Sequence, residues 1–321
     1  MTWAPGPDIR DFPDIFERAA FILAQSDLKP DGWRMENPVS MRLMERLRKT
    51  GTPLAEYVKG RFYYGIKTGL NEAFVVDRAT RDRLIAEHKS SADILKPFLR
   101  GRDVKRWRVD FAEQYLIKIE SSENKEHPWS GKPEKEAEKT FARTYPAIHG
   151  FIANMRKAMI DRYDQGKYFW ELRSCDYWQE FENPKILYPD IYEHQSFAWD
   201  TSGLYMGNTC YFIPLSDKWV IALLNSVTVE WFYGNIANRI RGGYLRAFSQ
   251  FIGQIPIPPA APAQQSLCER FAASLIWLHS PVAKREEDAS TGLMIADFEQ
   301  WLNGLVYELF FPSELHARKL K

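Results

Sequence analysis

The sequence contains few cysteines and no apolar run long enough to span a bilayer. Its 321 residues include three cysteines, which lie far apart and form no Cys-x-x-Cys pair: Cys175, Cys210 and Cys268. This pattern excludes a disulfide framework, a redox dithiol and a zinc ribbon, and it is typical of a reducing compartment. The start of the chain lacks the basic and apolar regions of a signal peptide. We therefore expect a soluble, cytoplasmic protein without a membrane partner.

The chain also lacks an excess of charge of either sign. It has 43 basic and 42 acidic side chains, which gives a formal net charge of +1 at pH 7. Any surface for nucleic acid must therefore come from local clusters of charge. The six histidines show no ligand spacing, so no metal site is predicted. With 45% hydrophobic residues, the chain can form one large domain or two smaller ones.

Hydrophobic periodicity predicts a mixed α/β (α+β) fold. Short apolar runs rich in β-branched and aromatic residues predict strands at 74–76, 115–119, 186–188 and 210–213. Apolar residues at helical spacing predict helices at 11–25, 40–49, 133–163 with a break near Pro146, 219–240, 264–279 and 291–310. Neither a helix nor a central strand can cross the proline-rich run 255–262, which marks the main boundary.

A polar loop lies between two apolar, strand-like runs in the segment 63–77. It contains two glycines and three polar residues within seven positions: Gly65, Lys67, Thr68, Gly69 and Asn71. Lysine and threonine can hold phosphate, and asparagine can pair with adenine in the major groove of DNA. Turn chemistry explains the three polar residues equally well, because asparagine tolerates a left-handed backbone and threonine bonds locally. The glycines supply backbone freedom, which a close approach to DNA would also use.

A dense basic segment follows about thirty residues later. Its cations surround Gly101 and Trp107, and they are Arg100, Arg102, Lys105, Arg106 and Arg108. Such a density can neutralise several phosphates. A solvated charged face is the alternative, but the neighbouring glycine loop favours DNA contact.

A third cluster lies at the predicted end of the helix 219–240. It combines two glycines with three arginines and a tyrosine: Arg239, Arg241, Gly242, Gly243, Tyr244 and Arg246. Arginine also compensates the negative end of a helix, and glycine is the expected stop signal. Both roles are compatible, and we expect this turn to approach the DNA backbone.

Five further blocks follow the loop and the basic segment in order: 184–190, 208–213, 222–226, 241–246 and 254–258. Together these blocks resemble the TaqI-like C-terminal specificity domain, from about Trp33 to the C-terminus. In that family the domain follows an adenine-N6 DNA methyltransferase, in type IIG restriction-modification enzymes and in phage-exclusion methyltransferases, and it reads the DNA target. The resemblance implies a target-recognition-domain-like sheet with flanking helices, in a bacterial or archaeal cytoplasm.

The resemblance and the periodicity together divide the chain into three predicted parts. Residues 1–52 would form a helical connector next to the methyltransferase, 53–258 the DNA target recognition domain, and 259–321 a C-terminal arm formed by a helix pair. Direct contacts to bases are also expected from 120–178, a region rich in aromatic and charged residues.

The motifs of an adenine-N6 methyltransferase are absent from the sequence. Such an enzyme needs an Asn/Asp-Pro-Pro-aromatic motif for the flipped base and a glycine-rich turn for S-adenosylmethionine. Asn37-Pro38 and Asn183-Pro184 each lack the second proline, and no Phe-x-Gly-x-Gly turn occurs. We therefore predict no enzyme activity and no cofactor in this chain, and we assign S-adenosylmethionine and Mg²⁺ to partner methyltransferase or nuclease domains or subunits.

The predicted function is sequence-specific recognition of double-stranded DNA, as a module of a restriction-modification or phage-defence methyltransferase system. A metal-dependent endonuclease is one alternative, with Asp110 and the triplet Glu123-Asn124-Lys125 as its best candidates. The second alternative is a non-catalytic assembly subunit that does not contact DNA.

Overall fold

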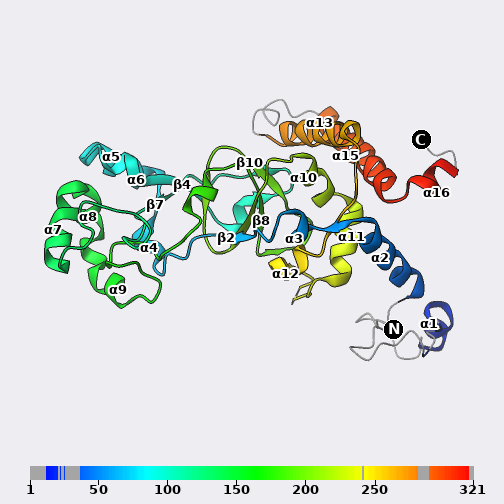
Figure 1. The fold of residues 1–321 in the computed structure, drawn as a ribbon, viewed down its shortest axis with the longest axis horizontal. Coiled ribbons are helices and arrows are strands. Elements are labelled where there is room, and N and C mark those ends of the chain that lie inside the picture. Colours follow the sequence, from blue (N-terminus) through cyan, green and yellow to red (C-terminus); the bar gives the residue numbers. More distant parts are fainter. Residues whose placement is uncertain are drawn as a thin grey trace.

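The computed structural model describes residues 12–20, 22, 25, 37–240, 242–280 and 289–317. These residues form an elongated molecule with two lobes, and β8 and β10 lie between them (Figure 1). Each lobe has its own hydrophobic core. The mixed α/β prediction is confirmed.

The central sheet separates the two cores. It has four antiparallel strands in the order β10-β8-β12-β2, which are Ala198–Asp200, Lys185–Pro189, Cys210–Pro214 and Tyr63–Tyr64. Successive side chains of a strand point to opposite faces. Accordingly, Ile186 and Tyr188 join the core of one lobe, and Leu187 joins the core of the other. Strand β8 is therefore buried on both faces, which explains the apolar run 186–189 that follows its buried Lys185.

A second four-stranded sheet organises the lobe drawn in cyan and green in Figure 1. Its order is β11-β4-β7-β3, formed by Tyr205–Met206, Leu95–Leu99, Gln114–Ile117 and Val75–Asp77, and only the β11–β4 pair is parallel. The helices of this lobe are α4 Asn71–Phe74, α5 Arg78–Glu87, α6 Ser91–Ile94, α7 Glu134–Thr144, α8 Pro146–Ile152 and α9 Arg156–Asp161. The four predicted strands and the break at Pro146 are confirmed.

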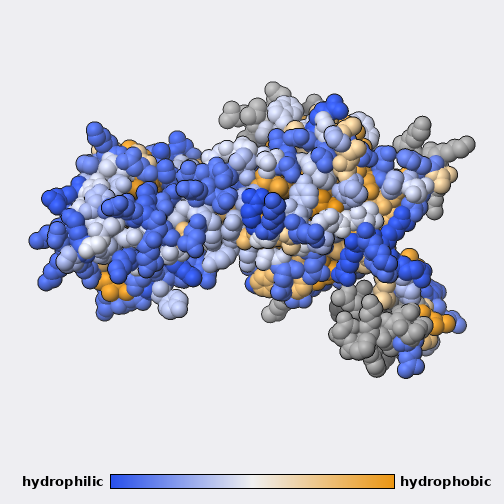
Figure 2. All heavy atoms as spheres, in the orientation of Figure 1, coloured by the Kyte–Doolittle hydropathy of each residue, from blue (hydrophilic) through white to orange (hydrophobic). Residues whose placement is uncertain are grey.

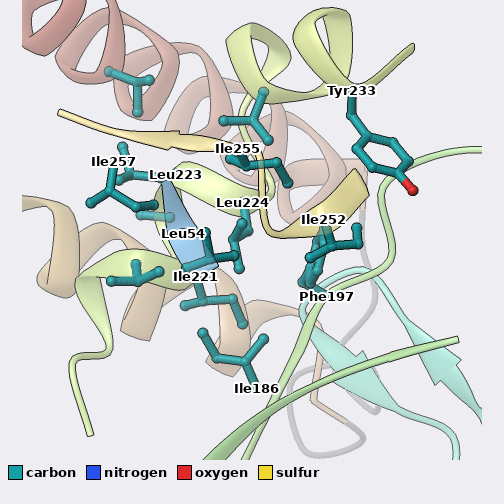
Figure 3. Packing of buried hydrophobic residues seen from close by; sticks show 14 of the residues in the cluster. Leu54, Ile186, Phe197, Ile221, Leu223, Leu224, Tyr233, Ile252, Ile255 and Ile257 are labelled. Carbon is teal, nitrogen blue, oxygen red and sulfur yellow. The ribbon is translucent and has the colours of Figure 1, made fainter. Parts of the chain in front are cut away.

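The other lobe is mainly helical. Its helices are α2 Pro38–Thr50, α3 Leu54–Tyr57, α10 Trp219–Leu224, α11 Val227–Ile236, α12 Ser249–Ile252, α13 Pro262–Leu278, α15 Ala289–Phe310 and α16 Pro312–Ala317. Figure 3 shows its core, in which Ile221, Leu224 and Ile255 are completely buried. The helix α1, Phe12–Ala19, is shorter than predicted and lies beyond α2 (Figure 1).

Three two-stranded ribbons complete the fold. They are β1 Thr52–Pro53 with β14 Pro256–Ile257, β9 Ile191–Tyr192 with β13 Leu245–Arg246, and β5 Val104–Lys105 with β6 Arg108–Val109. Strand β14 lies in the proline-rich run, and Pro262 begins α13, the helix position at which proline is best tolerated. The core of the helical lobe continues across this run, because Ile257 and Leu275 belong to it. The three-part division of the chain remains a prediction.

The single helix predicted over 219–240 is wrong, because two helices occupy this range. The Asn225 side chain exchanges hydrogen bonds with the backbone of Phe197, at 2.9 and 3.2 Å. The Ser226 hydroxyl then accepts from the Val229 amide and caps α11. Asparagine and serine favour such contacts over a helix interior.

The surface differs between the lobes. The lobe with α5 to α9 is mostly hydrophilic in the view of Figure 2. Large exposed apolar side chains occur on α13 and α15, namely Trp277, Leu293, Met294, Trp301 and Tyr307. No helix in the described part of the chain is long and apolar enough to cross a membrane.

Candidate nucleic-acid interface

A hollow of about 550 Å³ lies where several loops of the two sheets meet. The glycine loop and α4, the basic segment, and the turn before β12 all contribute to it. Its lining residues are Asn71, Glu72, Val75, Phe98, Arg100, Gly101, Arg102, Gln114, Gly207, Asn208 and Thr209. We call it the recognition hollow. Two of the three clusters predicted from the sequence thus meet at one site.

The glycine loop is held by a close backbone approach. A Cβ atom on Gly65 would lie 2.1 Å from the carbonyl oxygen of Gly207. The Ile66 amide donates to Met206 at 2.7 Å, and the Asn208 amide donates to Ile66 at 3.1 Å. Gly65 is buried, so its backbone freedom serves this protein contact. Gly69 has φ +69°, a left-handed conformation that favours glycine.

A buried arginine fixes the middle of the same loop. Arg162 donates to the carbonyl oxygens of Thr68 at 2.8 Å and Phe169 at 3.1 Å, and also to that of Glu171. Burial lowers the pKa of Arg162 to about 10, which leaves its guanidinium charged at neutral pH. Arg162 thus ties the Thr68 carbonyl of the glycine loop to the segment 169–171.

The three polar residues of the loop have different surroundings. Thr68 is 4% exposed, and its hydroxyl donates to Asn71 Oδ1 at 2.7 Å, as turn chemistry predicts. Asn71 is therefore a turn partner, and it is also exposed at the hollow; contact of its amide with DNA remains a prediction. Lys67 is exposed beside a smaller hollow of about 30 Å³ that also includes Arg173. Its Nζ lies 5.9 Å from the Tyr64 ring centroid.

The basic segment has a rigid turn at the hollow. The Gly101 amide donates to Thr209 Oγ1 at 2.9 Å, and a Cβ on Gly101 would lie 2.5 Å from the Thr209 carbonyl oxygen. The buried carboxylate of Asp103 accepts from the Arg100 amide at 2.8 Å and lies 3.5 Å from the Arg100 Nε. Arg102 has a side chain that is 70% exposed. Two cations therefore line the hollow at this turn. Asp103 partly neutralises the charge of Arg100, and the side chain of Arg102 is largely exposed to solvent.

The remaining cations of this segment lie further along the chain. Lys105 is exposed. Arg106 forms an ion pair of 2.8 Å with Glu299 on α15, and Arg108 pairs with Asp110 at 2.7 Å. These two arginines therefore have acidic partners within the protein.

The third cluster connects to the hollow through Asp190. Arg246 Nη2 lies 3.4 Å from Asp190 Oδ2, and the Asp190 amide donates to the Thr209 carbonyl oxygen at 2.9 Å. Arg239 is exposed and donates to the Gly243 carbonyl oxygen at 3.4 Å. Gly242 and Gly243 have φ values of +89° and +85°, and Tyr244 is 41% exposed. Arg241 lies outside the described residues.

The sequence interpretation missed several lining residues. Asn208 and Thr209 belong to a block that carried the resemblance, but no role was assigned to them. Glu72 is the second residue of α4, and Gln114 is the first residue of β7. No local pattern distinguishes them, since only folding brings them to the hollow.

The nuclease candidates have other partners. Asp110 pairs with Arg108, and Lys125 Nζ lies 3.4 Å from Glu120 Oε1. Among the residues that the structure describes, no group of three or more His, Cys, Asp or Glu could hold a metal ion.

The chain matches the model of a known protein family. The model of the TaqI-like C-terminal specificity domain matches residues 96–257, which is half of the chain. The chain belongs to this family. The match includes Arg100, Arg102 and the whole turn 207–209, so the TaqI-like specificity domain supplies most of the wall of the recognition hollow.

Relatives of this TaqI-like domain are methyltransferases. The type II methyltransferase M.PaeR7I of Pseudomonas aeruginosa is 22% identical over 256 residues, which cover 76% of this chain and 40% of the relative. M.BstVI of Geobacillus stearothermophilus is 21% identical over 87% of this chain and 48% of the relative. The chain thus spans less than half the length of these relatives.

A solved structure shares the fold. The type IIL restriction-modification enzyme MmeI, determined in complex with DNA, aligns with a TM-score of 0.51 and 15% identity. The alignment covers 81% of this chain and 34% of MmeI. The chain therefore shares the fold of about a third of this enzyme.

Proposed function

We propose that this chain reads a specific sequence in double-stranded DNA through the recognition hollow. The observation that carries the proposal is the convergence of the glycine loop, the basic segment and the turn 207–209 around one hollow. The composition of the glycine loop and of the basic segment suits contacts to phosphates and bases. Membership in a specificity family and similarity to type II methyltransferases support the same conclusion.

The side chains at the hollow suit direct reading of base edges. Amides such as Asn71 and Gln114 pair with adenine, arginine pairs with guanine, and a carboxylate such as Glu72 accepts from cytosine. The partly buried side chain of Val75 offers an apolar contact to the thymine methyl group. The exposed Arg102 at the hollow, and the exposed Lys67 at the smaller hollow beside it on the glycine loop, would hold phosphates and fix the register.

Chemistry on the DNA would come from a partner. The sequence contains neither the Asn/Asp-Pro-Pro-aromatic motif nor the glycine-rich turn of an adenine-N6 methyltransferase. We therefore assign methyl transfer, with its S-adenosylmethionine, to a methyltransferase domain or subunit that acts with this chain, and strand cleavage with Mg²⁺ to a nuclease partner.

Selection from a randomised duplex library tests the proposal. Purified protein is incubated with the library at about 50 and about 200 mM salt, and the retained DNA is sequenced. Enrichment of one short motif that persists at the higher salt is expected. Retention without a motif, or no retention, contradicts sequence-specific reading by this chain.

A further inference from the structure

The turn of the β5–β6 hairpin touches the helix α15 at a single carboxylate. Glu299 Oε1 accepts hydrogen bonds from Arg106 Nε and from Trp107 Nε1, each at 2.8 Å. The three side chains are largely sheltered, since Trp107 is 1% exposed and the Arg106 and Glu299 side chains are 24% and 27% exposed. Hydrogen bonds to a charged and partly buried acceptor are stronger than neutral ones.

Trp107 needs this support because its backbone conformation is strained. Its φ is +67°, in the left-handed region that a bulky side chain seldom adopts. Its amide donates to the Phe197 carbonyl oxygen at 2.9 Å. Such a conformation persists only when its surroundings fix it. Here the fixing contacts come from Phe197, which directly precedes β10, and from Glu299 on α15.

The same hairpin begins at the recognition hollow. Asp103, which holds the Arg100 amide, directly precedes β5, and Arg102 lines the hollow one residue earlier. Directly after the hairpin turn, Arg108 Nη1 lies 3.5 Å from His279 Nδ1, which follows α13. A short and continuous path of backbone thus joins the C-terminal helices to two cations of the hollow.

We propose that Glu299 is a positioning residue for DNA reading. It holds the β5–β6 turn on α15 and thereby fixes Arg100 and Arg102 at the hollow. This inference rests on the proposed function, but its structural half can be measured without DNA.

The first test is amide hydrogen exchange of residues 100–109 in the full chain. Glu299→Ala is expected to speed exchange of the Trp107 amide and its neighbours by about tenfold, which equals about 1.4 kcal/mol. Asp297→Ala is the matched control, because it removes an exposed carboxylate from the same helix. Glu299→Gln keeps an acceptor oxygen and should retain part of the protection. Equal exchange in the Glu299→Ala and Asp297→Ala variants overturns the proposal.

The second test uses DNA and separates the two proposals. The ratio of affinities for the selected duplex and a scrambled duplex should fall about tenfold in Glu299→Ala, less in Glu299→Gln, and not in Asp297→Ala. If Glu299 only stabilised the fold, Glu299→Ala would lower the free energy of unfolding and leave this ratio of affinities unchanged. Wild-type protein without any discrimination contradicts the proposed function, while the exchange test still decides the role of Glu299. Full discrimination in Glu299→Ala overturns the present inference alone.

Discussion

Gly65 packs its backbone directly on Gly207, and a methyl group on Gly65 would lie 2.1 Å from the Gly207 carbonyl oxygen. This contact joins the glycine loop, whose Asn71 lines the recognition hollow, to the turn before β12, whose Gly207 lines the same hollow. The shape of the hollow therefore depends on the absence of a side chain at Gly65.

We predict that Gly65→Ala lowers the free energy of unfolding by about 1–3 kcal/mol or more, because the added methyl meets backbone atoms that cannot move freely. Gly150→Ala is the matched control, since nothing lies within 4 Å of that position in α8 and alanine favours a helix. Urea denaturation of both variants measures the effect. Equal stability of the two variants would contradict the close approach.

Asn71 is expected to read a base rather than only to complete a turn. Asn71→Ala should relax discrimination at one adenine position by about 1–3 kcal/mol. Thr68→Val removes the same local hydrogen bond but leaves the Asn71 amide in place. Library selection with each variant distinguishes the roles. If both variants lose the same base preference, Asn71 acts only through the turn.

Arg102 is expected to contact phosphate. Arg102→Ala should weaken binding equally for all sequences, and the slope of log affinity against log salt should fall in magnitude by about 1. Arg270→Ala removes an exposed arginine from α13 and should leave both quantities unchanged. A salt titration of duplex binding measures them. If the slope of log affinity against log salt is unchanged in Arg102→Ala, the phosphate contact of Arg102 is contradicted.

His127 makes the stability of its lobe depend on pH. Its ring stacks on Trp129 with centroids 4.5 Å apart, and burial lowers the pKa of His127 below 6.5. As the pH falls, the unfolded chain binds the proton first, so the free energy of unfolding decreases through the window that extends downward from pH 6.5.

We predict that this decrease is smaller in His127→Gln than in the wild type. Urea denaturation at about pH 7.5 and about pH 5 measures the difference, and the other histidines cancel in the comparison. A decrease of equal size in both proteins would show that His127 is not the titrating group.

The sequence reveals the local parts of the site and of the fold. The density of glycine and arginine indicates the loop at Gly65 and the segment at Arg102, and short apolar runs identify the strands β3, β7, β8 and β12 but not β4, β10 or β11. Ser226 also indicates the helix break, because serine is a preferred helix cap. The strong apolar periodicity around it nevertheless predicts one long helix.

The long-range contacts could not be predicted from these patterns. Glu299 and Arg106 are 193 positions apart, and nothing local to either residue identifies the other as its partner. The same holds for Gly65 with Gly207 and for Asp190, which joins Thr209 to Arg246. Packing of the whole chain decides which cations remain exposed and which are neutralised.

The most direct test of the central claim is photo-crosslinking to duplex DNA from two defined positions. A photoreactive residue replaces either Asn208, which is exposed at the hollow, or Trp277, which is exposed on α13. The recognition hollow predicts crosslinks from position 208 that the selected duplex, but not a scrambled duplex, competes away. Crosslinks from position 277 in place of position 208 would show that another face of the molecule meets the DNA, and would contradict the account.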